Sequence, residues 1–196
     1  MIQPWKKIAS RPAGDFRIFK ARWDQKVSPR TGQAHEFVVL DTLDWVNVVA
    51  VTPEQELVMV EQYRHGTETV ELEIPGGLLD SAHETPLAAG LRELREETGY
   101  EGEQACVLCE QLPNPAFLSN RCSTVLVQRC VPKHPLAWDH AEDLVTHLVP
   151  VADLAGLVRS GRIRHSIIVA ALYHFELWRR GLPGPTAAEP QASSPA

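Results

Sequence analysis

Residues 92–99, on which the prediction of this fold depends, read Arg92-Glu93-Leu94-Arg95-Glu96-Glu97-Thr98-Gly99. Residues three and four positions apart are neighbours on an α-helix, so Glu93, Glu96 and Glu97 share one stripe of a single turn. Like charges at this spacing destabilise a helix by roughly 0.2 to 0.5 kcal/mol per pair, which favours a bound cation that neutralises them. Mg²⁺ prefers oxygen ligands and usually combines one or two carboxylates with substrate phosphates. Taken alone, such a stripe is more often a solvated helix face.

Sequence signals mark both ends of this helix. Thr85 can cap the amino end, Pro86 suits the first helical position, and Gly99 suits the left-handed residue that closes the carboxyl end. We expect the glutamates to point away from the buried face, and we expect Arg92 to pair with Glu96, four residues later. The residues predicted to form the buried face are Leu87, Leu91 and Leu94.

The segment before the helix completes a longer pattern. Glu73-Ile74-Pro75-Gly76-Gly77 reads as a strand end that runs into a glycine turn, and seven residues lie between Glu84 and Arg92. From Gly77 to Tyr100 the chain resembles the signature of the Nudix hydrolases, enzymes that cleave diphosphates linked to a second group. The family places five residues between its first glycine and first glutamate, whereas six separate Gly77 from Glu84 here. The helix carboxylates follow this insertion with their mutual spacing intact, so we expect the metal-binding face to survive it.

The pattern of strands and helices predicts an α+β fold or a three-layer αβα arrangement. Strand patterns occupy residues 16–27, 35–42, 46–51, 57–63, 68–74, 105–112, 122–130 and 144–149. The turn-rich segment from Ser28 to Gly32 predicts a hairpin between the first two strands. A last helix is expected from about Ser166 to Arg180, with an apolar face made of Ile168, Ala171, Leu172, Phe175 and Trp178. The resemblance implies the Nudix-type αβα sandwich with a mixed β-sheet.

The resemblance also implies how the chain is divided. In the branch of ADP-ribose and nucleoside diphosphate-sugar pyrophosphatases, an additional amino-terminal β segment helps to build a dimer, and residues 1–44 suit that role. The triplet Gln62-Tyr63-Arg64 resembles the one that precedes the signature in this branch. Residues 45–180 would form the Nudix hydrolase domain. From Gly181 onward the composition turns to Pro, Gly, Ala and Ser, so we interpret residues 181–196 as a flexible tail.

The same resemblance implies contacts with the substrate. Arg64 is the leading candidate, because a guanidinium offers a fork of donors that matches phosphate oxygens. Its alternative role is a structural ion pair with Glu68 or Glu71. A flat aromatic surface for the nucleobase is expected from Trp45 and Phe19, although each could equally belong to the core or to a dimer contact.

The resemblance further implies a metal site and a group that activates water. The expected ligands of Mg²⁺, with Mn²⁺ as an alternative, are the carbonyl of Gly76 and the carboxylates of Glu93, Glu96 and Glu97. Arg92 and Glu84 are expected to hold these ligands in place. The expected catalytic residues are Glu96 and Glu142, and Asp139 and Asp143 are rivals of Glu142 as the group that orients or deprotonates water.

Composition restricts the class of protein. The 196 residues, 44% of them hydrophobic, suffice for one domain with a smaller appendage. A net charge of −6 argues against binding to nucleic acid, which depends on clustered Lys and Arg. No apolar run approaches the roughly 20 residues that cross a bilayer, so we expect no membrane contact and a cytoplasmic location. We interpret the four cysteines as reduced packing residues, because Cys106 and Cys109 lack the second pair that a zinc site needs.

Together these features predict Mg-dependent hydrolysis of the diphosphate linkage of a nucleoside diphosphate sugar similar to ADP-ribose. The products would be a nucleoside monophosphate and a sugar phosphate. The expected partners are this small-molecule substrate and a second copy of the chain in a homodimer. Two alternatives stay open: a Nudix hydrolase acting on nucleoside triphosphates or dinucleoside polyphosphates, and a nucleotide-sugar-sensing module whose catalysis has lapsed.

Overall fold

The computed structural model describes residues 1–81, 83–138 and 143–182. Its strands are β1 (Lys6–Asp15), β2 (Lys20–Val27), β3 (Ala34–Asp41), β4 (Trp45–Val51), β5 (Glu56–Arg64), β6 (Thr69–Glu73), β7 (Gly76–Leu78), β8 (Tyr100–Glu101), β9 (Gln104–Gln111), β10 (Cys122–Gln128), β11 (Val131–Pro132) and β12 (Leu144–Pro150). Its helices are α1 (Pro86–Thr98), α2 (Leu154–Arg159) and α3 (Ser166–Arg179), with a 3-10 turn η1 at Val151–Asp153. The expected tail lies outside the described residues from position 183 onward.

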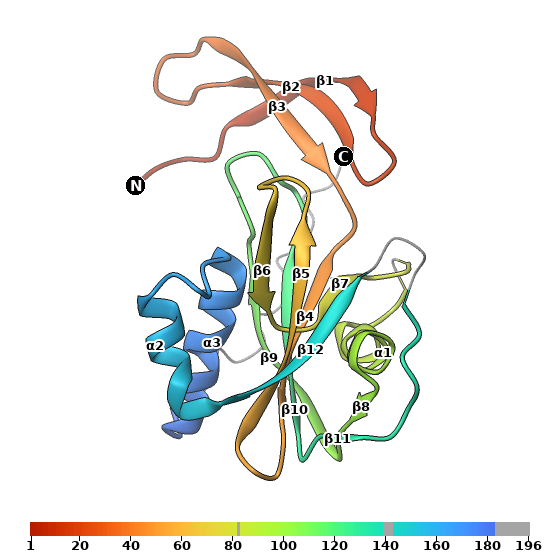
Figure 1. The fold of residues 1–196 in the computed structure, drawn as a ribbon. Helices are drawn as coiled ribbons and strands as arrows, with labels where there is room; N and C mark the ends of the chain where they lie inside the picture. The colour runs from red at the N-terminus through yellow and green to blue at the C-terminus, as the bar shows by residue number, and fades with distance from the viewer. Residues whose placement is uncertain (82, 139–142, 183–196) are drawn as a thin grey trace.

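A seven-stranded mixed sheet forms the centre of the molecule (Figure 1). Its main path runs β12-β5-β4-β10-β9, with β6 paired to β5 and β7 paired to β4. Strand β10 runs parallel to β4, and the other pairings are antiparallel. Helix α1 covers one face of this sheet, and α2 and α3 cover the other. This arrangement confirms the predicted αβα sandwich with a mixed sheet.

The central strand β4 contributes to two separate hydrophobic cores. Val46 and Val48 pack in a cluster that contains Leu94 of α1. Val49 points to the opposite face and packs in a cluster that contains Phe175 of α3. Successive side chains of a strand alternate between the faces of a sheet, so a sheet covered on both sides needs nearly continuous apolar strands. The apolar sequence of β4 meets this requirement.

The sheet divides between β4 and β5. These neighbouring strands share a single register pair, Val51 with Leu57, at one end. Farther along, residues 60–64 of β5 pair with β6, and residues 45–47 of β4 pair with β7. A cleft of about 900 Å³ opens where the two parts separate, and both Trp45 and Arg64 line it.

A three-stranded antiparallel sheet, β1-β2-β3, precedes the sandwich. The predicted hairpin is confirmed, because β2 and β3 are antiparallel and Gly32 N donates to Ser28 O at 2.8 Å in the turn between them. The predicted start of the first strand at Phe16 is wrong. Residues 16–19 form the turn between β1 and β2, where Phe16 N donates to Phe19 O at 2.9 Å.

Strand β1 carries no strand signal in its sequence. Nearly all of its residues are exposed, so it lacks the apolar alternation of a half-buried strand. Its register with β2 shifts between Lys7 and Ala9 and again between Pro12 and Gly14. Proline within sheets is confined to edges and bulges, because it cannot donate to the ladder. The hydrophobic pattern of the sequence therefore does not predict this irregular edge strand.

Polar contacts join the amino-terminal sheet to the sandwich. Ser119 Oγ, in the loop before β10, donates to Asp41 Oδ1 at 2.7 Å, and Leu40 N donates to Phe117 O at 2.8 Å. Arg22 of β2 binds the same Asp41 carboxylate, with its Nε 2.6 Å from Oδ2. The carboxyl end of β3 is therefore fixed against the loop of residues 113–120.

Helix α3 largely follows the predicted apolar face. Ile168, Ala171, Leu172 and Phe175 are buried, whereas Trp178 is exposed and stacks on Phe175 with ring centroids 6.0 Å apart. Within the described part of the chain, no helix combines the length and the apolar character needed to cross a membrane.

The cysteines are free thiols, as expected. Cys109, Cys122 and Cys130 are buried, and burial raises the pKa of the Cys122 thiol to about 12, which keeps it protonated. Cys106 is exposed, so the expectation that all four cysteines pack in the core is wrong for this residue. It lies on the edge strand β9, where one face meets solvent.

Candidate active site

Helix α1 begins and ends where the sequence predicts. Thr85 Oγ1 accepts a hydrogen bond from Ala88 N at 3.2 Å, and Pro86 occupies the first helical position. Gly99 has a φ of 72°, which L-residues with a side chain rarely adopt, and its N–H donates to Arg95 O at 2.9 Å. These caps fix the helix that carries the predicted glutamates.

The expectation that the glutamates point away from the sheet is wrong for two of them. Glu93 and Glu97 are only 8% and 3% exposed, whereas Leu91, which was expected to be buried, is 37% exposed. The reason is Gly90, where a Cβ would lie 2.9 Å from Val125 Cγ2. This glycine lets the helix approach the sheet closely, so the buried face is turned toward residues 90, 93, 94 and 97.

The glycine turn contacts both buried carboxylates. Gly76 N donates to Glu97 Oε2 at 3.0 Å. A Cβ on Gly77 would lie 2.3 Å from Glu93 Oε1, and one on Gly76 would lie 2.3 Å from Val46 O. A side chain at Gly76 would clash with the backbone, and one at Gly77 would displace the Glu93 carboxylate from its position, so the two glycines let the turn lie against β4 and against the carboxylates. The predicted proximity of Gly76 to the helix glutamates is therefore present.

Arg92 forms the centre of an ion-pair network beside this turn. Its guanidinium lies 3.1 Å from Glu84 Oε1, 2.9 Å from Glu93 Oε1 and 3.2 Å from Glu96 Oε2, and it donates to Leu78 O at 3.1 Å. The Arg92 hydrogen bond keeps the pKa of Glu84 below its ordinary value. The expected pair with Glu96 is present. The extra residue before Glu84 does not prevent that carboxylate from reaching Arg92.

The predicted metal ligands are only partly brought together. Glu93 and Glu97 meet the glycine turn, whereas Glu96 is directed to Arg92, which also binds Glu93. Within residues 1–81, 83–138 and 143–182, no three His, Cys, Asp or Glu side chains converge closely enough to hold an ion by themselves. The arrangement suits a cation that takes one or two carboxylates and completes its shell with phosphate and water oxygens.

Arg64 lies in the cleft, but its carboxylate partner is neither Glu68 nor Glu71. The guanidinium binds Glu73, with Nε 3.3 and 3.2 Å from the two carboxylate oxygens and Nη2 also in contact. Glu73 is only 2% exposed, whereas the Arg64 side chain is 43% exposed. The buried carboxylate therefore holds a guanidinium whose outer edge still faces the cleft.

The two predicted aromatic contacts differ in position. Trp45 lines the cleft. Phe19 is not among the residues lining it and stacks instead on Phe16, with ring centroids 5.0 Å apart, in the amino-terminal sheet. Glu142 and Asp139 lie outside the described residues. Asp143 is exposed and immediately precedes β12.

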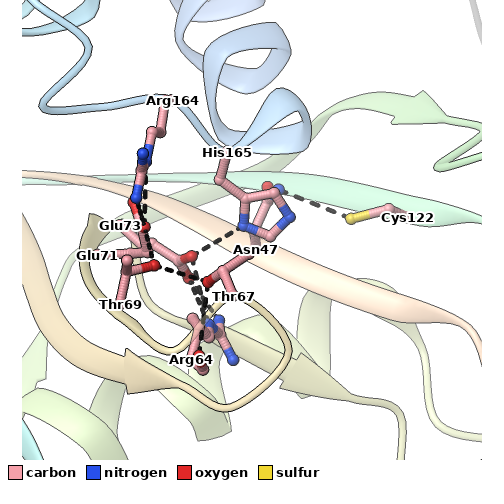
Figure 2. A network of polar contacts seen from close by, with 9 residues as sticks. All are labelled: Asn47, Arg64, Thr67, Thr69, Glu71, Glu73, Cys122, Arg164 and His165. Atoms are coloured by element: carbon pink, nitrogen blue, oxygen red, sulfur yellow. Dashed lines mark hydrogen bonds and ion pairs between the residues drawn. The ribbon is translucent and has the colours of Figure 1, made fainter.

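The Arg64–Glu73 pair belongs to a larger polar network of the cleft that the sequence did not predict (Figure 2). His165 Nδ1 lies 2.9 Å from Glu73 Oε1, and Arg164 Nε lies 3.0 Å from Glu71 Oε2. Both partners precede α3, whereas both carboxylates belong to β6. In the sequence, the only sign of this network is that Glu71 and Glu73 occupy alternate positions of one strand. That pattern does not indicate which residues they bind.

Comparisons with known proteins agree with this geometry. A family model described as the NUDIX domain matches residues 42–172. The chain belongs to the NUDIX family. The resemblance drawn from residues 77–100 is thereby confirmed, and the protein is a Nudix hydrolase.

Relatives of this NUDIX protein match over most of its length. It is 32% identical over 174 residues to the methanol dehydrogenase activator of Bacillus methanolicus, covering 88% of this chain and 92% of the relative. It is 32% identical over 170 residues to the ADP-ribose pyrophosphatase of Mycobacterium tuberculosis, covering 86% and 81%. A crystal structure of an ADP compounds hydrolase matches with a TM-score of 0.83 at 23% identity, covering 92% of this chain and 97% of that one. This structure shows the shared fold.

The Glu71–Arg164 pair predicts an acid-dependent contribution to the stability of this NUDIX domain. Hydrogen bonds from Arg164 and Thr69 lower the pKa of Glu71 to about 2 from an ordinary value of 4.5. A carboxyl whose pKa is lower in the folded state stabilises the fold fully above its unfolded pKa. The contribution is lost as pH falls from about 4.5 toward 2.

We therefore expect Arg164→Met to reduce the free energy of unfolding at pH 7, and we expect the difference from wild type to shrink between pH 4.5 and pH 2. The effect should be modest, because the Arg164 side chain is 56% exposed and solvent screens the pair. Urea unfolding at several pH values measures this difference. Arg159→Met is the control, since Arg159 is exposed and has no ion pair among the described residues. A difference independent of pH would contradict the assignment.

Proposed function

We propose that this NUDIX enzyme hydrolyses the diphosphate linkage of ADP-ribose or a closely similar nucleoside diphosphate sugar. One observation carries the proposal: the turn that contacts buried Glu93 and Glu97 also lines the cleft that contains Arg64. A diphosphate in this cleft could meet the carboxylate face and a guanidinium at once. The relative named as an ADP-ribose pyrophosphatase supports the choice of substrate. The products would be a nucleoside monophosphate and a sugar phosphate.

A divalent cation, Mg²⁺ or alternatively Mn²⁺, is part of this proposal. The donors that meet at the turn are the carboxylates of Glu93 and Glu97, and the Gly76 carbonyl belongs to the same turn. An all-oxygen donor set of this size fits Mg²⁺, which usually takes its other ligands from substrate phosphates and water. When bound, the ion would offset the diphosphate charge and act as a Lewis acid. Glu96 would join this set by releasing Arg92.

Arg64 is proposed to bind one phosphate of the substrate. Its Nε and Nη2 are engaged by Glu73, while no described residue accepts a hydrogen bond from Nη1. Planar guanidinium groups that are held in place lose less entropy when they bind phosphate oxygens. Water activation is assigned to Glu142 and Glu96, with Asp139 and Asp143 as rivals of Glu142.

Trp45 is the better placed of the two candidate base-binding residues, because it lines the cleft. A nucleobase stacked on its indole would lie beside the glycine turn, since Trp45 pairs with Leu78 in the β4–β7 ladder. Phe19 would reach a substrate only across a dimer interface.

We also propose that residues 1–44 build a homodimer and that residues 45–180 form the catalytic unit. Large apolar side chains of the amino-terminal segment are exposed, namely Trp5, Ile8, Phe37 and Val38. Among them Trp5 and Phe37 are in contact, with ring centroids 5.5 Å apart, and exposed apolar groups that lie together are typical of protein interfaces. A monomeric mass by sedimentation equilibrium would contradict the dimer.

The free cysteines support a reducing, cytoplasmic location.

A substrate screen tests the function. Purified protein would be incubated with ADP-ribose, several nucleotide sugars and nucleoside triphosphates, with and without Mg²⁺, and the products separated by chromatography. We expect AMP and ribose 5-phosphate from ADP-ribose, only when Mg²⁺ is present. Faster cleavage of triphosphates or dinucleoside polyphosphates would favour the alternative Nudix activity. Binding of ADP-ribose without turnover would favour a sensing module.

A further inference from the structure

Glu73 joins two residues of the cleft that are distant in sequence. Arg64 approaches its carboxylate from β5, and His165 approaches it from the position before α3, with Nδ1 2.9 Å from Oε1. Burial tends to raise the pKa of Glu73, but the hydrogen bonds from His165 and Arg64 outweigh it and the pKa lies below its ordinary value. The carboxylate is therefore ionised, and it fixes the guanidinium and the imidazole side by side.

The ionised carboxylate determines the tautomer of His165. A carboxylate only accepts hydrogen bonds, so Nδ1 carries the proton that it shares with Glu73, and Nε2 of the neutral ring is an acceptor. Figure 2 shows Nδ1 turned toward Glu73 and the other ring nitrogen on the far side of the imidazole. His165 lines the cleft with a side chain that is 38% exposed, and no described residue bonds to Nε2.

The surroundings of His165 favour a neutral ligand group that donates hydrogen bonds. Arg164 is paired with Glu71, and the charge of Arg64 is offset by Glu73, so beyond the phosphate assigned to Arg64 the described residues leave no unpaired cation on this wall for a second anion. Asn47 also lines this cleft, and its Oδ1 is a buried acceptor without a hydrogen-bond partner in the described part of the chain. Sugar hydroxyl groups are neutral, and they donate to such acceptors.

We propose that His165 is a substrate-binding residue whose Nε2 accepts a hydrogen bond from a hydroxyl group of the sugar attached to the phosphate that Arg64 binds. Arg64 and His165 bind the same carboxylate, that of Glu73. The distance between the phosphate site at Arg64 and the hydroxyl site at His165 is therefore fixed. The spacing suits a sugar phosphate, in which hydroxyl groups lie a few bonds from the phosphorus. This inference rests on the proposed function and specifies the sugar half of the substrate.

The test compares two substrates that share the ADP half. ADP-ribose carries the sugar hydroxyl groups, and the methyl ester of ADP retains the diphosphate but lacks that sugar. We expect His165→Leu to lower kcat/KM for ADP-ribose about tenfold, mostly through KM, because one hydrogen bond is lost. The methyl ester should be cleaved within about twofold of the wild-type rate. His165→Gln retains an amide donor for Glu73 and a carbonyl acceptor, so it should restore part of the loss.

His147→Leu is the matched control. His147 Nε2 lies 3.2 Å from Glu61 Oε2, so this variant removes a second His–Glu contact that is not part of the cleft lining. It should leave both substrates unaffected. An equal loss for both substrates in His165→Leu would mean that His165 acts only by positioning Arg64, and it would overturn the proposal. An unchanged rate for both substrates would also overturn it.

A binding measurement separates this inference from the proposed function. Ribose 5-phosphate would be titrated calorimetrically into wild-type protein and His165→Leu, with the thermal unfolding of both proteins recorded to exclude misfolding. We expect about tenfold weaker binding to the variant. Equal affinities would overturn the hydroxyl contact. If wild-type protein cleaved no ADP-sugar, the proposed function would fail, while this comparison would still decide the role of His165.

Discussion

Replacing Glu97 with glutamine should lower kcat for ADP-ribose by about a thousandfold, or roughly 4 kcal/mol in activation free energy, and leave the fold intact. Glu97 is only 3% exposed and lies on the face of α1 that meets the glycine turn. Glutamine has the same length, and its amide oxygen can still accept the hydrogen bond from Gly76 N. The change therefore removes mainly the negative charge that the proposed cation needs. Steady-state kinetics over a range of Mg²⁺ concentrations measure the effect.

Glu103→Gln is the control for this experiment. Glu103 pairs with Arg129 at the surface, and both side chains are more than half exposed. This variant should retain wild-type turnover and the wild-type dependence on Mg²⁺. Circular dichroism and thermal unfolding should be unchanged for Glu97→Gln. A Glu97→Gln variant with a normal rate in Mg²⁺ would count against the metal-binding face and against the activity assigned to it.

Replacing Arg92 with methionine should lower the free energy of unfolding by about 3 kcal/mol. Arg92 is the shared counter-ion of Asp80, Glu84, Glu93 and Glu96, and its own side chain is only 20% exposed. Methionine keeps much of the length but removes the cation that these four carboxylates share. Because Arg92 is partly accessible to water, the expected loss lies at the low end of the range for a broken buried pair. Urea unfolding measures it.

Mg²⁺ should restore part of the lost stability in Arg92→Met, because a ligand that binds only the folded state stabilises it by mass action. The thermal midpoint of this variant should therefore rise more with Mg²⁺ than that of the wild type. Arg92→Lys should be intermediate, since an ammonium group supplies the charge without the planar fork. If Arg92→Met were as stable as the wild type without Mg²⁺, the network would have no structural role.

The sequence predicted helix α1 well because its signals are local. Thr85, Pro86 and Gly99 act on the backbone within a few residues, so their effect can be read without knowledge of the rest of the fold. The sequence did not predict which face of helix α1 is turned toward the sheet. The burial of Glu93 depends on how closely Gly90 approaches Val125, which no periodicity in the helix reveals.

The cleft wall could not be predicted for a related reason. His165 and Glu73 are 92 residues apart, and each is an ordinary polar residue in its local context. Their contact depends on how the segment before α3 is placed beside β6, which is a property of the whole sandwich. The phosphate role of Arg64 comes only from the family likeness and stays a prediction, and the ion-pair partners considered as its alternative, Glu68 and Glu71, do not include Glu73, which it binds.

The division of the sheet between β4 and β5 has a consequence for how this enzyme could diversify. The glycine turn belongs to the β4–β7 half and contacts Glu93 and Glu97 of α1, whereas Arg64 and Glu73 belong to the β5–β6 half. If the proposed function holds, substitutions at the tip of the β5–β6 hairpin, residues 65–68, should change substrate selectivity and leave the glycine turn, Glu93 and Glu97 in place. Directed evolution aimed at new leaving groups would therefore begin at this tip.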